Sequence, residues 1–257
     1  MKPSSYWDLR IERAGELSQK HPVMAELLTF YAHLARFQKS VYEKLGSVQD
    51  HDVAVLLPFC GPLLSLIKQT GSAQLKQAAE SMAKVSPEDW QELLSSVWQH
   101  EADANEVAPE YLLFTKILLQ PYAEFLAHTA STIPENILSP VCPFCGAKPQ
   151  VAVMRPEGDG GKRSLICSVC STEWNFRRLV CPGCGEEKKE NLPVFIAEGF
   201  DYVRIDACDS CKTYIKSIDM TKDGRAVPVV DELATTSLNL WAQEKNYQKF
   251  ELNLFGV

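Results

Sequence analysis

The residues with the most distinctive chemistry in this chain are cysteines that occur in pairs. Cys60 stands alone, and the other eight cysteines lie in the second half of the chain as four C-x-x-C pairs. The pairs are Cys142 with Cys145, Cys167 with Cys170, Cys181 with Cys184, and Cys208 with Cys211. Two such turns can place four thiolates around one metal ion in a tetrahedral shell. The four pairs therefore predict two metal sites.

The spacing of the pairs indicates how they combine. The two pairs of the first block are separated by 21 residues and those of the second block by 23, slightly more than the 15 to 20 of a typical four-cysteine zinc site. A hairpin between the pairs accommodates the difference. We therefore assign the first two pairs to one ion and the last two to the other, and call these sets the first and second clusters. A cross-braced arrangement, which pairs alternate turns, is the alternative.

The ligand set leaves the metal open, because tetrahedral sulfur suits both zinc and iron. Gly146 and Gly185 directly follow two of the turns, where glycine permits a positive φ and lets backbone N–H groups face the sulfurs. Zinc ribbons and rubredoxin-type iron sites share this geometry. One alternative is a pair of zinc ions that only hold small β-modules together. A thioredoxin-type dithiol is less favoured, because one exchange reaction does not need four regularly spaced pairs.

The segments next to the cysteines contain aromatic and cationic side chains, which are favoured in protein interfaces. We predict a partner-binding surface from them, and the alternative is that the tryptophan covers a metal site while the cations are solvated. The residues are Trp174, Arg177, Arg178, Lys212, Tyr214 and Lys216.

No other motif predicts catalysis. Cys60 has no apparent histidine or aspartate partner and is interpreted as a core thiol. His100-Glu101 begins like a zincin helix, but Ala104 stands where the second histidine would be. We expect neither a catalytic residue nor an organic cofactor. A solvated acidic segment is the interpretation of Asp103, Glu106 and Glu110.

The elements that must position the cysteines differ between the two halves. Before residue 140, apolar residues recur at helical spacing, which predicts helices. Ser86 and Asp89 flank Pro87 in the pattern of a helix N-cap. The expected helices cover Ser4–Lys20, Pro22–Gly46, Leu56–Gln69, Ala73–Lys84, Pro87–His100 and Pro109–Thr129, and residues 131–140 form a connection.

From residue 141 on, β-prone runs flank glycine-containing turns, which predicts two hairpins. The first pairs Gln150–Arg155 with Arg163–Ile166, and the second pairs Val194–Ala197 with Tyr202–Ile205. Asp231–Glu244 returns to helical spacing. The two cysteine blocks thus form an internal repeat of pair, hairpin and pair.

The predicted fold class is α+β, with an N-terminal all-α domain followed by two small rubredoxin-like or zinc-ribbon β-modules. The predicted parts are residues 1–140, a helical domain; residues 141–180, the first four-cysteine ribbon; residues 181–230, the second ribbon; and residues 231–257, a helical segment and tail.

Composition limits the classes of partner. The 257 residues carry a formal charge of −7, which gives no general attraction to nucleic acid. The uncharged stretch Ala54–Ile67 is shorter than the roughly 20 apolar residues of a membrane span, and prolines interrupt it. The first residues lack the apolar core of a secretory signal. We therefore expect a cytoplasmic protein without membrane insertion, in which cysteines are thiols or ligands rather than disulfides.

The cysteine turns and their flanks together resemble the formate dehydrogenase accessory protein FdhE family. The resemblance spans most of the chain, and its C-terminal block is the most specific part. It rests on Arg13, His21-Pro22, Leu34-Ala35, Gln38, CPFCG, CSVCSTEW with Arg177 or Arg178, CDSCKTYIKSID, Pro228, Asp231-Glu232-Leu233-Ala234-Thr235 and Asn253-Leu254-Phe255. Departures are Asn239 in place of an aspartate, Asn246 in place of glycine, and Ser164 in place of an aromatic residue.

This resemblance implies a non-enzymatic cytoplasmic helper. Such a protein acts on the catalytic subunit of a respiratory formate dehydrogenase, a molybdenum or tungsten enzyme, before export by the twin-arginine route. The family's metal centres look rubredoxin-like, which favours two iron ions, with zinc as the alternative. The rival functions are a zinc-ribbon module that binds nucleic acid or serves as a scaffold, and a catalytic thiol oxidoreductase. The oligomeric state is left open.

Overall fold

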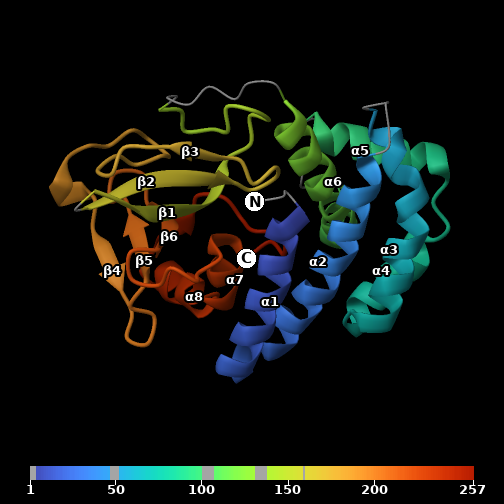
Figure 1. Cartoon of the computed structure of the whole chain (residues 1–257), viewed down its shortest axis with the longest axis horizontal. Helices are drawn as coiled ribbons and strands as arrows, with labels where there is room; N and C mark the ends of the chain where they lie inside the picture. Colours follow the sequence, from blue (N-terminus) through green and yellow to red (C-terminus); the bar gives the residue numbers. More distant parts are fainter. Residues whose placement is uncertain (1–3, 47–51, 100–106, 131–137, 159) are drawn as a thin grey trace. The chain divides into compact units, whose positions relative to one another are not determined.

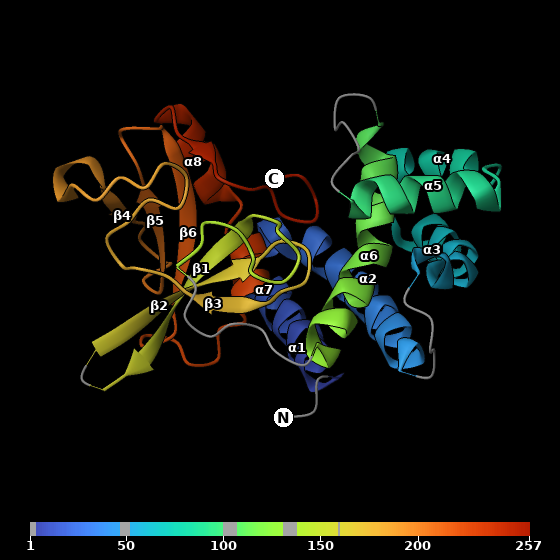
Figure 2. The ribbon, with the colours of Figure 1, turned by 90° about the horizontal axis from the view of Figure 1, so that it is seen from above.

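The computed structural model describes residues 4–46, 52–99, 107–130, 138–158 and 160–257. The chain forms two compact units, Met1–Thr129 and Ala130–Phe255. Figures 1 and 2 show the first unit as helices and the second as a sheet accompanied by helices. This order confirms the predicted fold class. The predicted part boundaries at residues 140, 180 and 230 stay predictions.

The described residues of the first unit form six α-helices, and sequence periodicity predicted all six. Helix α2 packs against both α1 and α6, and the unit's core contains fully buried Leu28, Leu34, Leu63, Ile67 and Phe114. The helices are α1 (Ser4–Lys20), α2 (Ala25–Leu45), α3 (Leu57–Thr70), α4 (Ala73–Met82), α5 (Pro87–Trp98) and α6 (Pro109–Thr129), with short 3₁₀ turns at Pro22–Met24 and Val53–Leu56.

A buried ion pair ties α1 to α6. The Arg10 guanidinium lies 2.8 Å from the Glu124 carboxylate and 4.4 Å from the centre of the Trp7 ring. Both partners are buried, so each charge depends on the other for its stabilisation. The periodicity of α1 did not predict this pair, because the spacing of apolar residues does not show which charged side chains are buried.

The cap at the start of α5 confirms a sequence prediction. The Ser86 hydroxyl accepts a hydrogen bond from the Asp89 N–H at 3.1 Å and donates one to the Asp89 carboxylate at 2.7 Å. Replacing Ser86 with alanine leaves that N–H without its acceptor, so we expect a loss of about 1 kcal/mol in the free energy of unfolding. Urea unfolding followed by circular dichroism measures it. An unchanged unfolding midpoint would show that the cap is dispensable.

One helical stretch in the described part of the chain, Val53–Thr70, is long and apolar enough by composition to cross a membrane. About a third of it is buried inside the protein, including Leu56, Leu63 and Ile67. The core helix of a globular protein has the same composition, so this feature is weak evidence for a membrane span. His100, Glu101, Asp103 and Glu106 lie outside the described residues.

The second unit contains a seven-stranded sheet of order β3-β2-β1-β6-β5-β4, with β7 paired to β6. Both predicted hairpins are confirmed as β1–β2 and β4–β5. Strands β1 and β6 pair in parallel, and this pairing joins the two cysteine blocks into one sheet. The strands are β1 (Pro149–Glu157), β2 (Gly160–Cys167), β3 (Glu173–Asn175), β4 (Val194–Ile196), β5 (Val203–Ala207), β6 (Thr213–Asp219) and β7 (Gln248–Lys249), with a 3₁₀ turn at Lys189–Asn191.

The two faces of β4, β5 and β6 have different surroundings. Val203, Ile205 and Ala207 of β5 share a buried cluster with Leu238 and Ala242 of helix α8 (Ser237–Glu244). Because side chains alternate along a strand, Arg204 and Asp206 lie on the opposite face. This second face, which we call the open face, borders the second cysteine cluster, as described below.

The predicted helix over Asp231–Glu244 is wrong in one respect: it is two helices, α7 (Pro228–Ala234) and α8. The Lys216 ammonium donates to the carbonyls of Glu232 and Thr235, and the Thr235 hydroxyl donates to the Asp231 carbonyl. These side-chain donors satisfy carbonyls at the end of α7 that a continuous helix would bond to later backbone N–H groups. The spacing of apolar residues in the sequence does not show that side-chain donors compete with backbone N–H groups for these carbonyls.

Candidate metal centres

The structure brings the eight paired cysteines together as two separate groups of four. Within each group all four sulfur atoms lie within 4.8 Å of one another. The groups are Cys142, Cys145, Cys167 and Cys170, and Cys181, Cys184, Cys208 and Cys211. The pairing along the chain is therefore sequential, and the cross-braced alternative does not occur. Each group could hold one metal ion.

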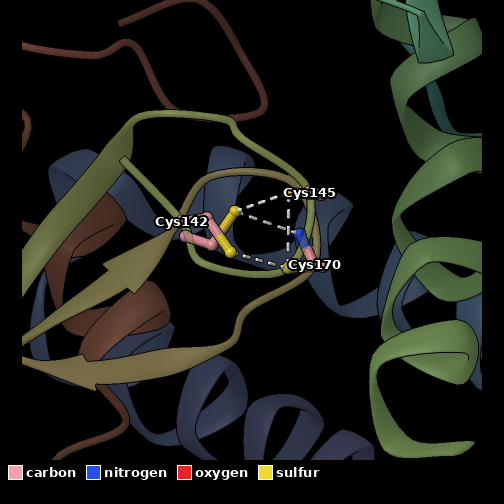
Figure 3. Close-up of side chains that lie close together, drawn as sticks. Cys142, Cys145 and Cys170 are labelled. Atoms are coloured by element: carbon pink, nitrogen blue, oxygen red, sulfur yellow. Dashed lines mark hydrogen bonds between the residues drawn. The ribbon is translucent and has the colours of Figure 1, made fainter. Parts of the chain in front are cut away.

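The first cluster has sulfur spacings that suit a tetrahedral shell. The Cys145 sulfur lies 3.4 Å from that of Cys167 and 3.5 Å from that of Cys170. The sulfurs of Cys142 and Cys170 are 3.5 Å apart, and Figure 3 shows the side chains of Cys142, Cys145 and Cys170 gathered at one point. Metal–sulfur bonds of about 2.3 Å imply tetrahedral edges of about 3.8 Å, so these three spacings need only lengthen slightly to suit a bound ion.

The second cluster repeats this geometry. Its sulfurs are 3.6 Å apart between Cys181 and Cys211 and also between Cys184 and Cys208. The backbone bonds repeat as well: the Gly146 N–H donates to the Cys142 carbonyl, and the Gly185 N–H to the Cys181 carbonyl, both at 3.0 Å. The donor set of four thiols in both places fits zinc or iron equally well.

Every C-x-x-C turn is followed by a residue in the left-handed region. Gly146 and Gly185 both have φ of 76°, as the sequence predicted. Ser171 and Lys212 follow the other two turns with φ of 52° and 57°. A non-glycine residue adopts this conformation at some cost. The same conformation follows the second C-x-x-C turn of each cluster. This recurrence indicates that closing the sulfur shell determines the backbone conformation there.

Two threonine hydroxyls contact the clusters, and sequence reasoning missed them. Thr172 lies 3.1 Å from the Cys170 sulfur, and Thr213 lies 3.0 Å from the Cys211 sulfur. A hydroxyl that donates to a thiolate stabilises its charge. The available signal was the shared pattern C-x-x-C-x-T, which occurs once in each block at these positions.

The sulfurs of the first cluster influence one another's ionisation. Hydrogen bonding from Cys145 is the main reason that the pKa of Cys142 is lowered, and hydrogen bonding with Cys142 is the main reason that the pKa of Cys167 is raised. Such a set of thiols shares its protons, and a metal ion that binds there displaces them. Cys60 behaves differently, because burial raises the pKa of its thiol to about 12. This agrees with its interpretation as an unreactive core thiol.

The two clusters differ in exposure. In the first, Cys142, Cys167 and Cys170 are buried. In the second, Cys184 is exposed and Cys211 is half-buried. Solvent and a partner therefore reach the second cluster more readily than the first.

Glu186 holds together the two loops of the second cluster. Its carboxylate accepts hydrogen bonds from the Ser210 hydroxyl at 2.5 Å and from the Asn191 amide at 2.9 Å. These bonds, with the Ser210 contact the largest, lower the pKa of Glu186 to about 2. The carboxylate therefore stays ionised at neutral pH. It holds the loop that contains Cys184 against the loop that contains Cys208.

The six residues predicted to contact a partner divide into two groups. Trp174, Tyr214 and Lys216 are buried, and the Trp174 indole N–H donates to the Ser139 carbonyl. Their burial leaves these three side chains little surface for a partner to contact. The exposed members are Arg177, Arg178 and Lys212, and they stay a prediction.

This chain is similar to known proteins in both sequence and fold. The families described as "FdhE, central domain" and "FdhE, C-terminal domain" match residues 141–178 and 179–255. A protein from Aquifex aeolicus (strain VF5), "Protein FdhE homolog", is 30% identical, with 97% of this chain and 95% of that protein aligned. A protein of the same name from Pectobacterium carotovorum is 26% identical, with 98% and 87% aligned.

The fold is also found in a solved structure. The crystal structure of the FdhE protein from Pseudomonas aeruginosa superposes with a TM-score of 0.81 at 22% identity, covering 99% of this chain and 96% of that one. This likeness shows that the helical unit and the two-cluster sheet are a shared fold. Together with the full-length relative at 30% identity, it leads to one conclusion: this chain belongs to the FdhE family.

Proposed function

We propose that this chain is a non-catalytic accessory protein that supports the maturation of formate dehydrogenase. In this proposal it binds the enzyme's catalytic subunit in the cytoplasm before that subunit is exported. The observation that supports it most is the relationship to "Protein FdhE homolog" along 97% of the chain, together with two complete four-cysteine clusters. If this chain had lost its clusters, the relationship alone would support the role far less.

We propose that each cluster holds one metal ion through its four cysteines. A bound iron ion would supply one-electron chemistry, and a bound zinc ion would only cross-link the loops. The family resemblance favours iron. In both cases the chain's own part is the same. The turns of each cluster fix four sulfurs, and one threonine hydroxyl lies against one of them, from Thr172 in the first cluster and from Thr213 in the second. The sheet then holds the two metal centres in fixed positions at the surface.

No observation favours the nucleic-acid alternative. A ribbon that binds RNA or single-stranded DNA needs exposed aromatic rings for stacking and exposed cations for the phosphates. Trp174 and Tyr214, the aromatic candidates, are buried, and Lys216 is also buried. The formal charge of the chain is −7, which opposes a general attraction to phosphates.

Copurification tests the proposed function. A tagged formate dehydrogenase catalytic subunit that keeps its export signal, produced anaerobically with this chain, is expected to retain this chain on an affinity column. Nuclease treatment should not change the retention. An unrelated exported enzyme with the same tag is the control. Equal recovery of this chain on both columns in repeated experiments would contradict the proposed function.

A further inference from the structure

Three large apolar side chains are exposed on strand β4 and on the segment that precedes Cys181. Leu179 is 58% exposed, Val194 is 51% exposed and Ile196 is 58% exposed. Val194 and Ile196 lie opposite Asp206 and Arg204 in the β4–β5 pairing, so they share the open face of the sheet. Apolar groups that gather on one face commonly mark an interaction site.

A cavity opens beside two of these side chains. It has a volume of about 100 Å³, and both Leu179 and Val194 line it. Its wall also includes Cys181 and Cys208, two cysteines of the second cluster. Water occupies about 30 Å³ per molecule, so the cavity is large enough for one apolar side chain of a partner. Whatever fills it lies directly beside the second cluster.

The charged groups of the cavity are mostly cationic. Arg163, Arg178 and Arg204 line it, and Asp206 is the one acidic residue among its lining residues. Asp206 is shared: one carboxylate oxygen lies 3.4 Å from the Arg163 guanidinium and the other lies 2.9 Å from that of Arg204. Arg178 forms no ion pair with a carboxylate among the described residues; its guanidinium contacts the Gly161 carbonyl at 3.4 Å.

These guanidiniums determine which chemical group a partner needs in order to bind here. Arginine binds carboxylates through directed N–H donors in a planar fork. Asp206 already pairs with Arg163 and Arg204, so Arg178 is the guanidinium at the cavity that can take a carboxylate from a partner. A carboxylate next to an apolar side chain therefore satisfies the cavity and its mouth together.

We propose that Leu179, Val194, Ile196, Arg178 and Arg204, which we call the docking patch, are the surface that receives the partner. The occupant is a segment of the immature catalytic subunit with a large apolar side chain beside a carboxylate. This inference rests on the proposed function and deepens it. It makes the second cluster, which is the more exposed of the two, the partner-facing one, while the first cluster serves the fold.

Matched substitutions in the full-length, metal-loaded protein test the docking patch. Leu179→Asp and Val194→Asp place a charge in the patch, and Arg178→Glu reverses an exposed charge there. The matched controls are Leu240→Asp, at a leucine that is 62% exposed on α8, and Arg225→Glu, whose side chain is 81% exposed. Affinity for the purified catalytic subunit is measured by biolayer interferometry, with metal content and thermal midpoint as checks on folding.

Each patch variant is expected to bind about tenfold more weakly or worse, as hot-spot residues do, while both controls bind like wild type. Arg178→Glu keeps the test valid if an aspartate in the patch disturbs folding. Patch variants that bind as tightly as their controls would overturn the docking patch and leave the proposed function intact. A wild-type chain that does not bind would overturn both. A wild-type dimer that Leu179→Asp dissociates would assign the patch to a second copy and also overturn the proposal.

Discussion

Replacing Cys167 with serine is expected to lower the metal content from two ions per chain to one and to destabilise the second unit. Cys167 is fully buried at the end of β2, and its sulfur receives N–H groups from Val169 and Cys170. A serine hydroxyl does not replace a thiolate ligand. Because structural zinc in small domains binds with about 10–16 kcal/mol of apparent free energy, losing even part of one site should lower the thermal midpoint by about 10 °C or more.

Cys60→Ala is the matched control for this experiment. Cys60 is buried like Cys167 but lies outside both clusters, so its replacement should leave two ions per chain. Plasma emission spectroscopy counts the ions, and calorimetry gives the midpoints. Two ions retained by Cys167→Ser, with an unchanged midpoint, would show that the first cluster is not a metal site.

Replacing Glu232 with alanine should have the second-largest effect on stability. Its carboxylate is fully buried and lies 2.8 Å from the Lys216 ammonium and 2.6 Å from that of Lys249. The Asn253 amide donates to its other oxygen at 2.9 Å. One side chain therefore connects α7 to β6, to β7 and to the C-terminal segment.

The cost of this substitution follows from the two lysines that remain. Lys216 is fully buried, and burial lowers its pKa to about 8. Without Glu232 its charge has no carboxylate partner, and removing one member of a buried pair typically costs about 3–5 kcal/mol. Urea unfolding of the metal-loaded protein measures the loss. The control is Glu187→Ala, which breaks the exposed pair with Arg177 and should cost less than about 1 kcal/mol.

Glu232→Gln separates charge from hydrogen bonding. A glutamine can still accept from Lys216 and Lys249, so a smaller loss than in Glu232→Ala is expected if the hydrogen bonds matter beside the charge. Equal unfolding free energies for wild type and Glu232→Ala would contradict the structural role assigned to this network.

Local patterns in the sequence predicted most of the elements. The three-and-four spacing of apolar residues gave all six helices of the first unit, and glycine-containing turns gave the hairpins β1–β2 and β4–β5. The C-x-x-C spacing gave both cysteine groups and the left-handed Gly146 and Gly185. These features depend on residues close together in the chain, which explains their success.

Features that depend on distant residues were missed. Strand β6 contains Lys216, which was predicted to lie on a partner-binding surface or to be solvated, yet its ammonium donates to a carbonyl of α7 sixteen residues later. The parallel pairing of β1 with β6 joins residues such as Ala152 and Ser217, and no local pattern reports it. The partner prediction failed to anticipate the burial of Tyr214 for the same reason.

Asn246 is a departure from the family pattern that a local conformational preference explains. The family resemblance places a glycine there, and the structure gives Asn246 a φ of 63°. Asparagine tolerates the left-handed region better than most residues do, so this departure keeps the turn. Asn239, the other departure in this segment, is buried, and its side-chain amide has no hydrogen-bond partner among the described residues. Nothing in the structure explains that substitution.

The most direct test of the account is the metal content of wild-type protein purified without oxygen. We predict two ions per chain and no rapidly reacting thiol under native conditions, because in the proposed metal-loaded protein eight cysteines bind the ions and Cys60 is buried. An iron–thiolate absorption spectrum would identify the proposed redox-capable metal, and colourless zinc would identify a purely structural one. Metal-free protein with eight rapidly reacting thiols would contradict the central claim that the two clusters are metal centres.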